Sequence, residues 1–234
     1  MKHIGIVACS AEGAALCYRT ICLEGPAMMG EAYAHPEVSL HGESLAAYSR
    51  CLDRDDWQGV GDLMLASAHK LAKAGADFLI CPDNTIHQAL PYVEPRSPLP
   101  WLHIAEVVAA EAAQRRFRRV GLLGTKWLVQ GDVYPEKLAR RRIECVRPEP
   151  AERAEINRII MDELVNGQFK PEGVAFHLRV IERYKHDGCD AVVLGCTEIP
   201  LIIDDANSPL PVLDSTRLLA RAALHRALGT AVRS

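Results

Sequence analysis

The chain contains one strand-and-loop pattern twice, and this duplication limits its possible folds more than any other feature. Gly75 to Thr85 reads G-A-D-F-L-I-C-P-D-N-T, and Gly188 to Glu198 reads G-C-D-A-V-V-L-G-C-T-E. Each copy has an aspartate before a short apolar run, which is typical of a buried parallel strand, and ends in polar residues. Aligned without a gap, Asp83 of the first copy matches Cys196 of the second.

Further repeats extend the duplication to most of the chain. I-G-I-V-A-C-S from Ile4 resembles V-G-L-L-G-T-K from Val120, and S-P-L-P occurs at Ser97 and again at Ser208, each time before a predicted helix. Repeated strand–helix units favour parallel sheets with helices on both faces. We therefore predict two similar three-layer α/β domains with parallel sheets, related by a pseudo-twofold axis, with a cleft between them.

The predicted domain boundaries follow from the repeats. Residues 1–98 together with 211–234 form the expected N-terminal α/β domain, and 99–210 form the C-terminal one. The proline-rich segment 91–100 is expected to be a linker or crossover. The predicted strands are 4–8, 37–40, 78–81, 120–123, 143–146 and 190–194, and the predicted helices are 14–22, 57–75, 134–141, 152–166 and 173–186.

Composition excludes several classes of partner. The net charge is −3, so the chain has no basic field for nucleic acid. No apolar run approaches the roughly 20 residues that a membrane helix needs. The eight cysteines include no C-x-x-C pair, which argues against zinc, and there is no G-x-G-x-x-G for a dinucleotide. We expect a cytoplasmic protein with no nucleic-acid or membrane partner and reduced thiols.

The second copy of the repeat places a thiol where ligands bind in α/β proteins. The apolar run stops at Gly195, so Cys196 lies just past the carboxyl end of the strand, the edge at which open α/β sheets bind ligands. Thr197 and Glu198 are predicted to start a helix whose free backbone N–H groups could hold an anion. Alternatively, Cys196 is a buried structural cysteine.

These residues resemble the cofactor-independent aspartate/glutamate racemase superfamily over nearly the whole chain. The resemblance rests on the glycine-containing first strand, Asn84-Thr85, Gly124-Thr125 and the G-C-T-E of 195–198. It implies a two-domain α/β enzyme, often a homodimer, that acts on a small carboxylate or amino acid. It also implies two facing cysteines, one removing the α-proton and the other returning one, without metal or pyridoxal phosphate.

The chain departs from the family pattern at the first of these cysteines. Asp83 occupies the position directly before Asn-Thr, and Cys81, two residues earlier, is expected not to reach the same point. The expected catalytic pair is therefore Asp83 and Cys196. A carboxylate is the weaker base, with a reference pKa of roughly 3.9 against 8.5 for a thiol, although burial raises a carboxyl pKa. Asp83 could instead simply cap a helix.

The remaining candidate residues surround this pair. Proton removal needs hydrogen-bond donors where negative charge develops, and strand ends and helix starts provide them. Glu198 is predicted to contact substrate or to support a helix dipole, and His87 to orient its loop. His41 and Arg50 are candidates for gripping a second carboxylate. The predicted substrate-binding residues are Ser10, Asn84, Thr85, Thr125, Lys170, Thr197 and Glu198, with Ser10, Thr125 and Lys170 placed by the resemblance.

Three functions remain open at this point. The first is a cofactor-independent racemase of aspartate, glutamate or a similar amino acid, which inverts the α-carbon by proton transfer between Cys196 and Asp83. The second is decarboxylation or cis-trans isomerisation of a small dicarboxylate by Cys196 alone, which the resemblance also allows. The third is an amino-acid-binding relative without catalytic activity.

Overall fold

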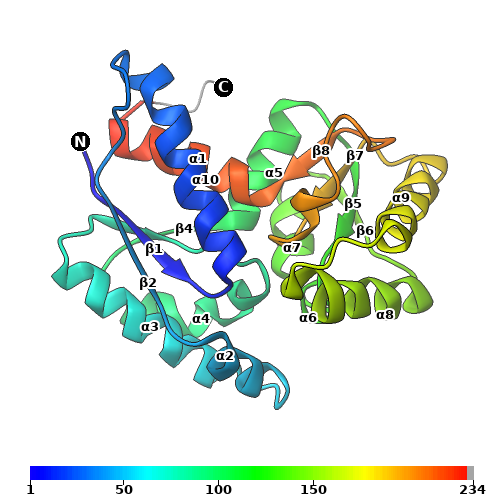
Figure 1. Cartoon of the computed structure of the whole chain (residues 1–234), viewed down its shortest axis with the longest axis horizontal. Helices are drawn as coiled ribbons and strands as arrows, with labels where there is room; N and C mark the ends of the chain where they lie inside the picture. The colour runs from blue at the N-terminus through cyan, green and yellow to red at the C-terminus, as the bar shows by residue number, and fades with distance from the viewer. Residues whose placement is uncertain (231–234) are drawn as a thin grey trace. The chain divides into compact units, whose positions relative to one another are not determined.

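The computed structural model describes residues 1–230 and contains two compact units, each built on a parallel four-stranded sheet (Figure 1). Of the described residues, the first unit comprises Met1–Val107 and 216–230, and the second comprises Val108–Ser215. The domain limits that the sequence predicts, 1–98 with 211–234 and 99–210, remain a prediction. None of the helices within residues 1–230 combines the length and apolar character needed to cross a bilayer.

The two sheets have the same topology, as the duplicated sequence predicts. The strands of the first sheet are β1 (Ile4–Ala8), β2 (Val38–Gly42), β3 (Phe78–Ile80) and β4 (Trp101–Leu102), in the order β2-β1-β3-β4. Those of the second are β5 (Arg119–Leu123), β6 (Glu144–Val146), β7 (Ala191–Leu194) and β8 (Val212–Asp214), in the order β6-β5-β7-β8. All pairings are parallel. The predicted α/β class is confirmed.

Helices cover the first sheet on both faces. They are α1 (Ala11–Met29), α2 (Leu45–Leu52), α3 (Trp57–Lys73), α4 (Leu90–Val93) and α10 (Ser215–Leu228), with 3₁₀ turns η1 (Thr85–Ala89) and η2 (Glu94–Arg96). Helix α5 (Ile104–Gln114) begins in the first unit and continues in the second. On one face, Ile6 and Ile80 pack with Ile21 of α1 and Leu224 of α10. Figure 1 shows α1 and α10 side by side, and α3 lies beyond the strands from them. The apolar strand runs are therefore buried on both sides.

The second sheet is covered in the same way. Its helices are α6 (Lys126–Gln130), α7 (Val133–Ala139), α8 (Pro150–Arg158) and α9 (Pro171–His186), with a π turn η3 (Ile159–Glu163) and 3₁₀ turns η4 (Leu164–Asn166) and η5 (Ile199–Leu201). Ile156 of α8 and Ile181 of α9 share a buried core with Val192 and Leu194 of β7.

The aspartates that open the duplicated strands perform the same task in both units. The backbone N–H of His3 donates to the Asp77 carboxylate at 2.7 Å, and the Asp77 N–H returns a bond to the His3 carbonyl at 2.9 Å. In the second unit, the Arg119 N–H donates to Asp190 at 3.0 Å, and the Asp190 N–H donates to the Arg119 carbonyl at 2.7 Å. Each aspartate thus joins its own strand to the neighbouring one.

The two S-P-L-P segments form matching turns. The Ser97 hydroxyl donates to the Leu99 carbonyl at 2.7 Å, and the Ser208 hydroxyl donates to the Leu210 carbonyl at the same distance. A short strand follows each turn, and a helix follows each strand. The repeat in sequence is therefore also a repeat in hydrogen bonding.

Several predicted elements differ in the structure. The segment 91–100, expected to be a linker or crossover, contains most of α4 and all of η2, because Pro91 and Pro95 lie in first helical turns, where proline loses no hydrogen bond. The predicted helix 152–166 begins at Pro150 and passes after Arg158 into η3 and η4. This change of winding keeps Ile159, Ile160 and Leu164 in the core.

Candidate active site

The carboxyl end of β7 owes its geometry to two glycines. The Gly195 N–H donates to the Leu123 carbonyl at 2.8 Å, which continues the β5–β7 pairing past the strand end. A Cβ atom at Gly195 would lie 2.7 Å from that carbonyl oxygen, and one at Gly124 would lie 3.1 Å from the Gly195 oxygen. Only glycine fits this close approach of two backbones, which brings Cys196 and Thr125 to neighbouring strand ends.

The thiol of Cys196 forms a hydrogen bond with a buried carboxylate. Cys196 Sγ donates to Glu198 Oε2 at 2.9 Å, and the Thr197 hydroxyl donates to the same oxygen at 2.8 Å. The three residues are at most 7% exposed. Sequence reasoning missed this contact, although a spacing of two residues in a turn was a signal for it. A carboxylate so placed can accept the thiol proton.

The predicted helix after Cys196 is wrong. The chain forms only the three-residue 3₁₀ turn η5, so no α-helix N-terminus stabilises a thiolate at Cys196. The cause is packing: Ile199, Ile202 and Ile203 all enter the core that contains Cys196, which holds the chain against the sheet. The charge beside the thiol is instead that of Glu198.

Asp83 lies at the corresponding strand end of the first unit. Its Oδ1 accepts hydrogen bonds from the backbone N–H of Thr85 at 3.1 Å and of Ile86 at 3.4 Å. The capping role considered from the sequence is therefore present, and both bonds stabilise the ionised carboxylate. Asp83 is partly exposed, whereas Asn84 and Thr85 are buried.

Cys81 lies in the core of the first unit. Its side chain is fully buried, and its thiol donates to the Asp83 carbonyl at 3.7 Å. Burial and the Asp83 charge raise the pKa of the Cys81 thiol well above its ordinary value. A thiol that stays protonated inside the core is inert as a base.

His87 orients the loop, as the sequence predicts. Its Nδ1 lies 2.8 Å from the Asp83 carbonyl, and its Nε2 accepts from the Ile104 N–H at 3.3 Å. Because Nε2 accepts, Nδ1 carries the hydrogen and donates to Asp83. Both ring nitrogens are thereby used for structure.

Ser10 and Thr125 are equivalent caps in the two units. The Ser10 hydroxyl accepts from the Gly13 N–H at 3.3 Å at the start of α1, and the Thr125 hydroxyl accepts from the Leu128 N–H at 3.3 Å at the start of α6. Both residues follow central strands of their sheets, as expected for ligand-binding positions.

Lys170 is engaged by a carboxylate in the second unit. Its Nζ lies 3.6 Å from Glu163 Oε1, which also accepts from Arg158 at 2.8 Å. The two cations lower the pKa of Glu163. The Lys170 side chain is 52% exposed, so it retains solvent-facing donors. Lys170 is the N-cap residue of α9. Because the other end of α9 leads into the start of β7, this N-terminus lies toward the carboxyl edge of the sheet.

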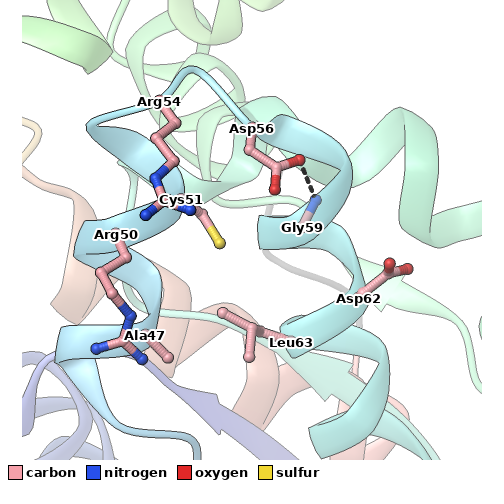
Figure 2. Close-up of a pocket in the computed structure, with 8 residues that line it drawn as sticks. All are labelled: Ala47, Arg50, Cys51, Arg54, Asp56, Gly59, Asp62 and Leu63. Carbon is pink, nitrogen blue, oxygen red and sulfur yellow. Dashed lines mark hydrogen bonds between the residues drawn. The ribbon is translucent and has the colours of Figure 1, made fainter.

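The structure assigns other surroundings to His41 and Arg50. His41 Nδ1 lies 3.0 Å from the Ser67 hydroxyl and its Nε2 lies 3.0 Å from Lys70 Nζ, so both ring nitrogens are occupied. Arg50 lines a hollow of about 350 Å³ between α2 and α3 (Figure 2). Neither arrangement supports a role in binding a second carboxylate.

The comparisons with known proteins agree with one another. The model of the Asp/Glu/Hydantoin racemase family matches residues 26–223. The broad specificity amino-acid racemase RacX of Bacillus subtilis (strain 168) is 25% identical over 189 residues, which are 80% of this chain and 80% of that protein. The structure of an aspartate racemase homologue from Pyrococcus horikoshii OT3 superposes with a TM-score of 0.82 at 30% identity, covering 97% of this chain and all of the other.

An aspartate racemase from Picrophilus torridus shares the fold, with a TM-score of 0.78 at 21% identity over 100% of this chain and 96% of the other. The duplicated parallel units and the family match define the chain as an isomerase of the racemase class. The chain belongs to the Asp/Glu/Hydantoin racemase family.

Proposed function

We propose that this amino-acid racemase acts on aspartate or glutamate and inverts the α-carbon by proton transfer between Cys196 and Asp83. One observation carries the proposal: the buried Cys196–Glu198 hydrogen bond lies at the end of β7, and the sequence repeat aligns Cys196 with Asp83 at the end of β3. The substrate class is supported by the relatives described as aspartate or glutamate racemases. The cytoplasmic location and the homodimer stay predictions.

On the Cys196 face, Glu198 serves as the proton acceptor of the thiol. The thiol proton moves to the Glu198 carboxylate, and the resulting thiolate removes the α-proton of the substrate. A carbanion remains, with its negative charge spread onto the substrate carboxylate. Backbone N–H donors at the strand ends around Thr125 and Thr197 are suited to stabilise that charge, because they are fixed before the reaction begins.

On the opposite face, Asp83 completes the inversion. In its protonated form the carboxyl group gives its proton to the carbanion, which leaves Asp83 ionised and held by the backbone N–H groups of Thr85 and Ile86. For the other enantiomer the steps run in reverse, with ionised Asp83 taking the α-proton and the Cys196 thiol returning one. Exchange with solvent restores both groups after each turnover.

The test is proton NMR in deuterated water with each enantiomer of aspartate, glutamate and a wider amino-acid panel. We expect loss of the α-proton signal and appearance of the mirror-image product for one acidic amino acid. Cys196→Ala should abolish inversion. Asp83→Asn should also abolish inversion, while the enantiomer deprotonated by Cys196 continues to exchange with solvent. Full activity of either variant contradicts the two-base mechanism.

A second candidate reaction follows from the unequal pair. One thiol without a thiol partner suits decarboxylation of a malonate-type substrate or cis-trans isomerisation of an unsaturated diacid. Carbon dioxide release from a malonate panel, or isomerisation of a diacid, in the absence of any α-proton exchange would favour this candidate.

A further inference from the structure

Tyr48 of α2 carries a hydroxyl group that no partner satisfies. Its side chain is 0% exposed, and within residues 1–230 its hydroxyl has no hydrogen-bond partner. Leaving a buried donor unpaired costs folding free energy, so natural proteins seldom retain one without a use.

The other two fully buried tyrosines show the ordinary solution. The Tyr184 hydroxyl donates to the Leu122 carbonyl at 2.9 Å, and the Tyr134 hydroxyl hydrogen-bonds the Ser215 side chain. A phenylalanine at position 48 would fill the same space without the unpaired group. Burial alone therefore does not account for the tyrosine.

The topology places Tyr48 at the edge of the sheet that carries Asp83. The helix α2 begins three residues after β2 ends at Gly42, so its first turn lies at the carboxyl edge of the first sheet. Ile6 of β1 pairs with Ile80 of β3. Cys9 comes three residues after Ile6, and Asp83 comes three residues after Ile80, so both lie equally far beyond this pair. Tyr48, Cys9 and Asp83 therefore share one edge.

The charges around Tyr48 agree with this placement. After burial itself, the groups that raise the pKa of Tyr48 are the thiols of Cys9 and Cys81 and the carboxylates of Asp83 and Glu43. A phenol that stays protonated among such groups can only donate its hydrogen or accept one from a neutral acid. The half-buried carboxylate of Asp83 is an acceptor of this kind.

We propose that Tyr48 is a positioning residue for Asp83, whose carboxylate it hydrogen-bonds while that group exchanges a proton with substrate. The inference rests on the proposed function, which makes Asp83 one of the two bases. Because Tyr48 is wholly buried and Asp83 partly exposed, the bond reaches the carboxylate from the protein side. Asp83 Oδ1 already accepts from the Thr85 and Ile86 N–H groups, and the Tyr48 hydroxyl adds a third donor to this carboxylate.

The variant Tyr48→Phe tests the proposal, because it removes only the hydroxyl. The thermal midpoint should stay unchanged or rise, since no hydrogen bond of the resting protein is lost. Racemisation should fall roughly ten- to hundredfold, the usual effect of losing a hydrogen bond to a charged group. Solvent exchange should slow only for the enantiomer deprotonated by Asp83 and persist for the one deprotonated by Cys196.

Tyr184→Phe is the matched control. It removes a hydroxyl that is hydrogen-bonded in the resting protein, so it should lower the thermal midpoint and leave the ratio of the two exchange rates unchanged. Unchanged racemisation in Tyr48→Phe, or equal slowing of both enantiomers, would overturn the proposal for Tyr48. Failure of the proposed function itself is recognised separately, in protein with Tyr48 intact, by the Cys196→Ala and Asp83→Asn exchange measurements.

Discussion

Cys196 and Glu198 are joined by a hydrogen bond of 2.9 Å from thiol to carboxylate, inside a turn that begins where β7 ends. The carboxylate stands where a helix N-terminus was expected, and the two have opposite effects on a neighbouring thiol. A helix N-terminus favours the thiolate, whereas a carboxylate favours the protonated thiol and can take its proton. The 2.9 Å contact with Glu198 therefore gives the Cys196 thiol a hydrogen-bond acceptor, which the proposed mechanism uses as its proton acceptor.

Glu198→Gln should separate acidity from catalysis at Cys196. The neutral amide no longer repels a thiolate, so iodoacetamide should modify Cys196 faster at neutral pH, as followed by mass spectrometry of its peptide. Racemisation should fall by about 10²–10⁴-fold, because the proton acceptor is lost. Glu182→Gln, on the exposed surface of α9, is the control and should change neither rate. Slower alkylation in Glu198→Gln would contradict the assignment.

The unequal bases should give unequal kinetics in the two directions. Mirror symmetry fixes the equilibrium constant of a racemisation, so kcat/KM must be the same for both enantiomers. The individual kcat and KM values, and the isotope effects with α-deuterated substrate, should differ, because a carboxylate and a thiolate remove the proton in opposite directions. Progress curves by circular dichroism from each pure enantiomer measure this. Identical kcat values and isotope effects would indicate equivalent bases.

Lys170→Met should raise KM about tenfold if Lys170 binds the substrate carboxylate, with little change in kcat, because the lost interaction is made equally in ground and transition states. Stability should hardly change, since the contact of this half-exposed side chain with Glu163 at 3.6 Å is weak. Lys185→Met, at an exposed position near the other end of α9, is the control. An unchanged KM in Lys170→Met would remove Lys170 from the site.

Gly195→Ala should destabilise the second unit by about 1–3 kcal/mol, the usual cost of overpacking. The added Cβ would lie 2.7 Å from the Leu123 carbonyl oxygen, a backbone atom that cannot move without disturbing the β5–β7 pairing. Denaturant unfolding measures the loss, and activity should fall further because Cys196 follows directly. A variant with wild-type stability would show that the strand ends are not held as described.

Stability should decline in alkaline solution. Burial raises the pKa of Cys145 to about 12 and that of Cys189 to about 11. The unfolded chain releases these protons near a pKa of about 8.5, while the folded chain keeps them. Their contribution to the free energy of unfolding is therefore complete below that pH and is lost as the pH rises above it. The thermal midpoint should fall between pH 8 and pH 10. Cys145→Ala should show a smaller fall; an equal fall would assign the effect to other groups.

The sequence predicted the fold well where a repeat was present. Asp77 and Asp190 were matched by alignment alone, and each makes the same strand-opening hydrogen bonds. The S-P-L-P turns at Ser97 and Ser208 also agree in detail. Duplicated sequence succeeds here because each copy must satisfy the same local hydrogen bonds and bury the same faces.

Prediction failed where tertiary packing decided the outcome. The first helix was expected to end at Cys22, but α1 continues through Pro26 to Met29. Pro26 lies near the helix end, where proline removes only one hydrogen bond, and Gly30 forms the left-handed C-cap. The turn after Cys196 stays short because its isoleucines enter the core. Likewise, no pattern in the sequence indicates that the Tyr48 hydroxyl is left unpaired.

The hydrogen bond from Cys196 to Glu198 also bears on how long the enzyme survives in an oxidising cell. Peroxide attacks thiolates, and a thiol held protonated beside a negative charge is a poor target for conversion to sulfenic acid. Many enzymes that depend on a cysteine keep it ionised and therefore vulnerable between turnovers. In the proposed mechanism the reactive form arises only when Glu198 takes the proton, so the resting protein should resist oxidation at Cys196.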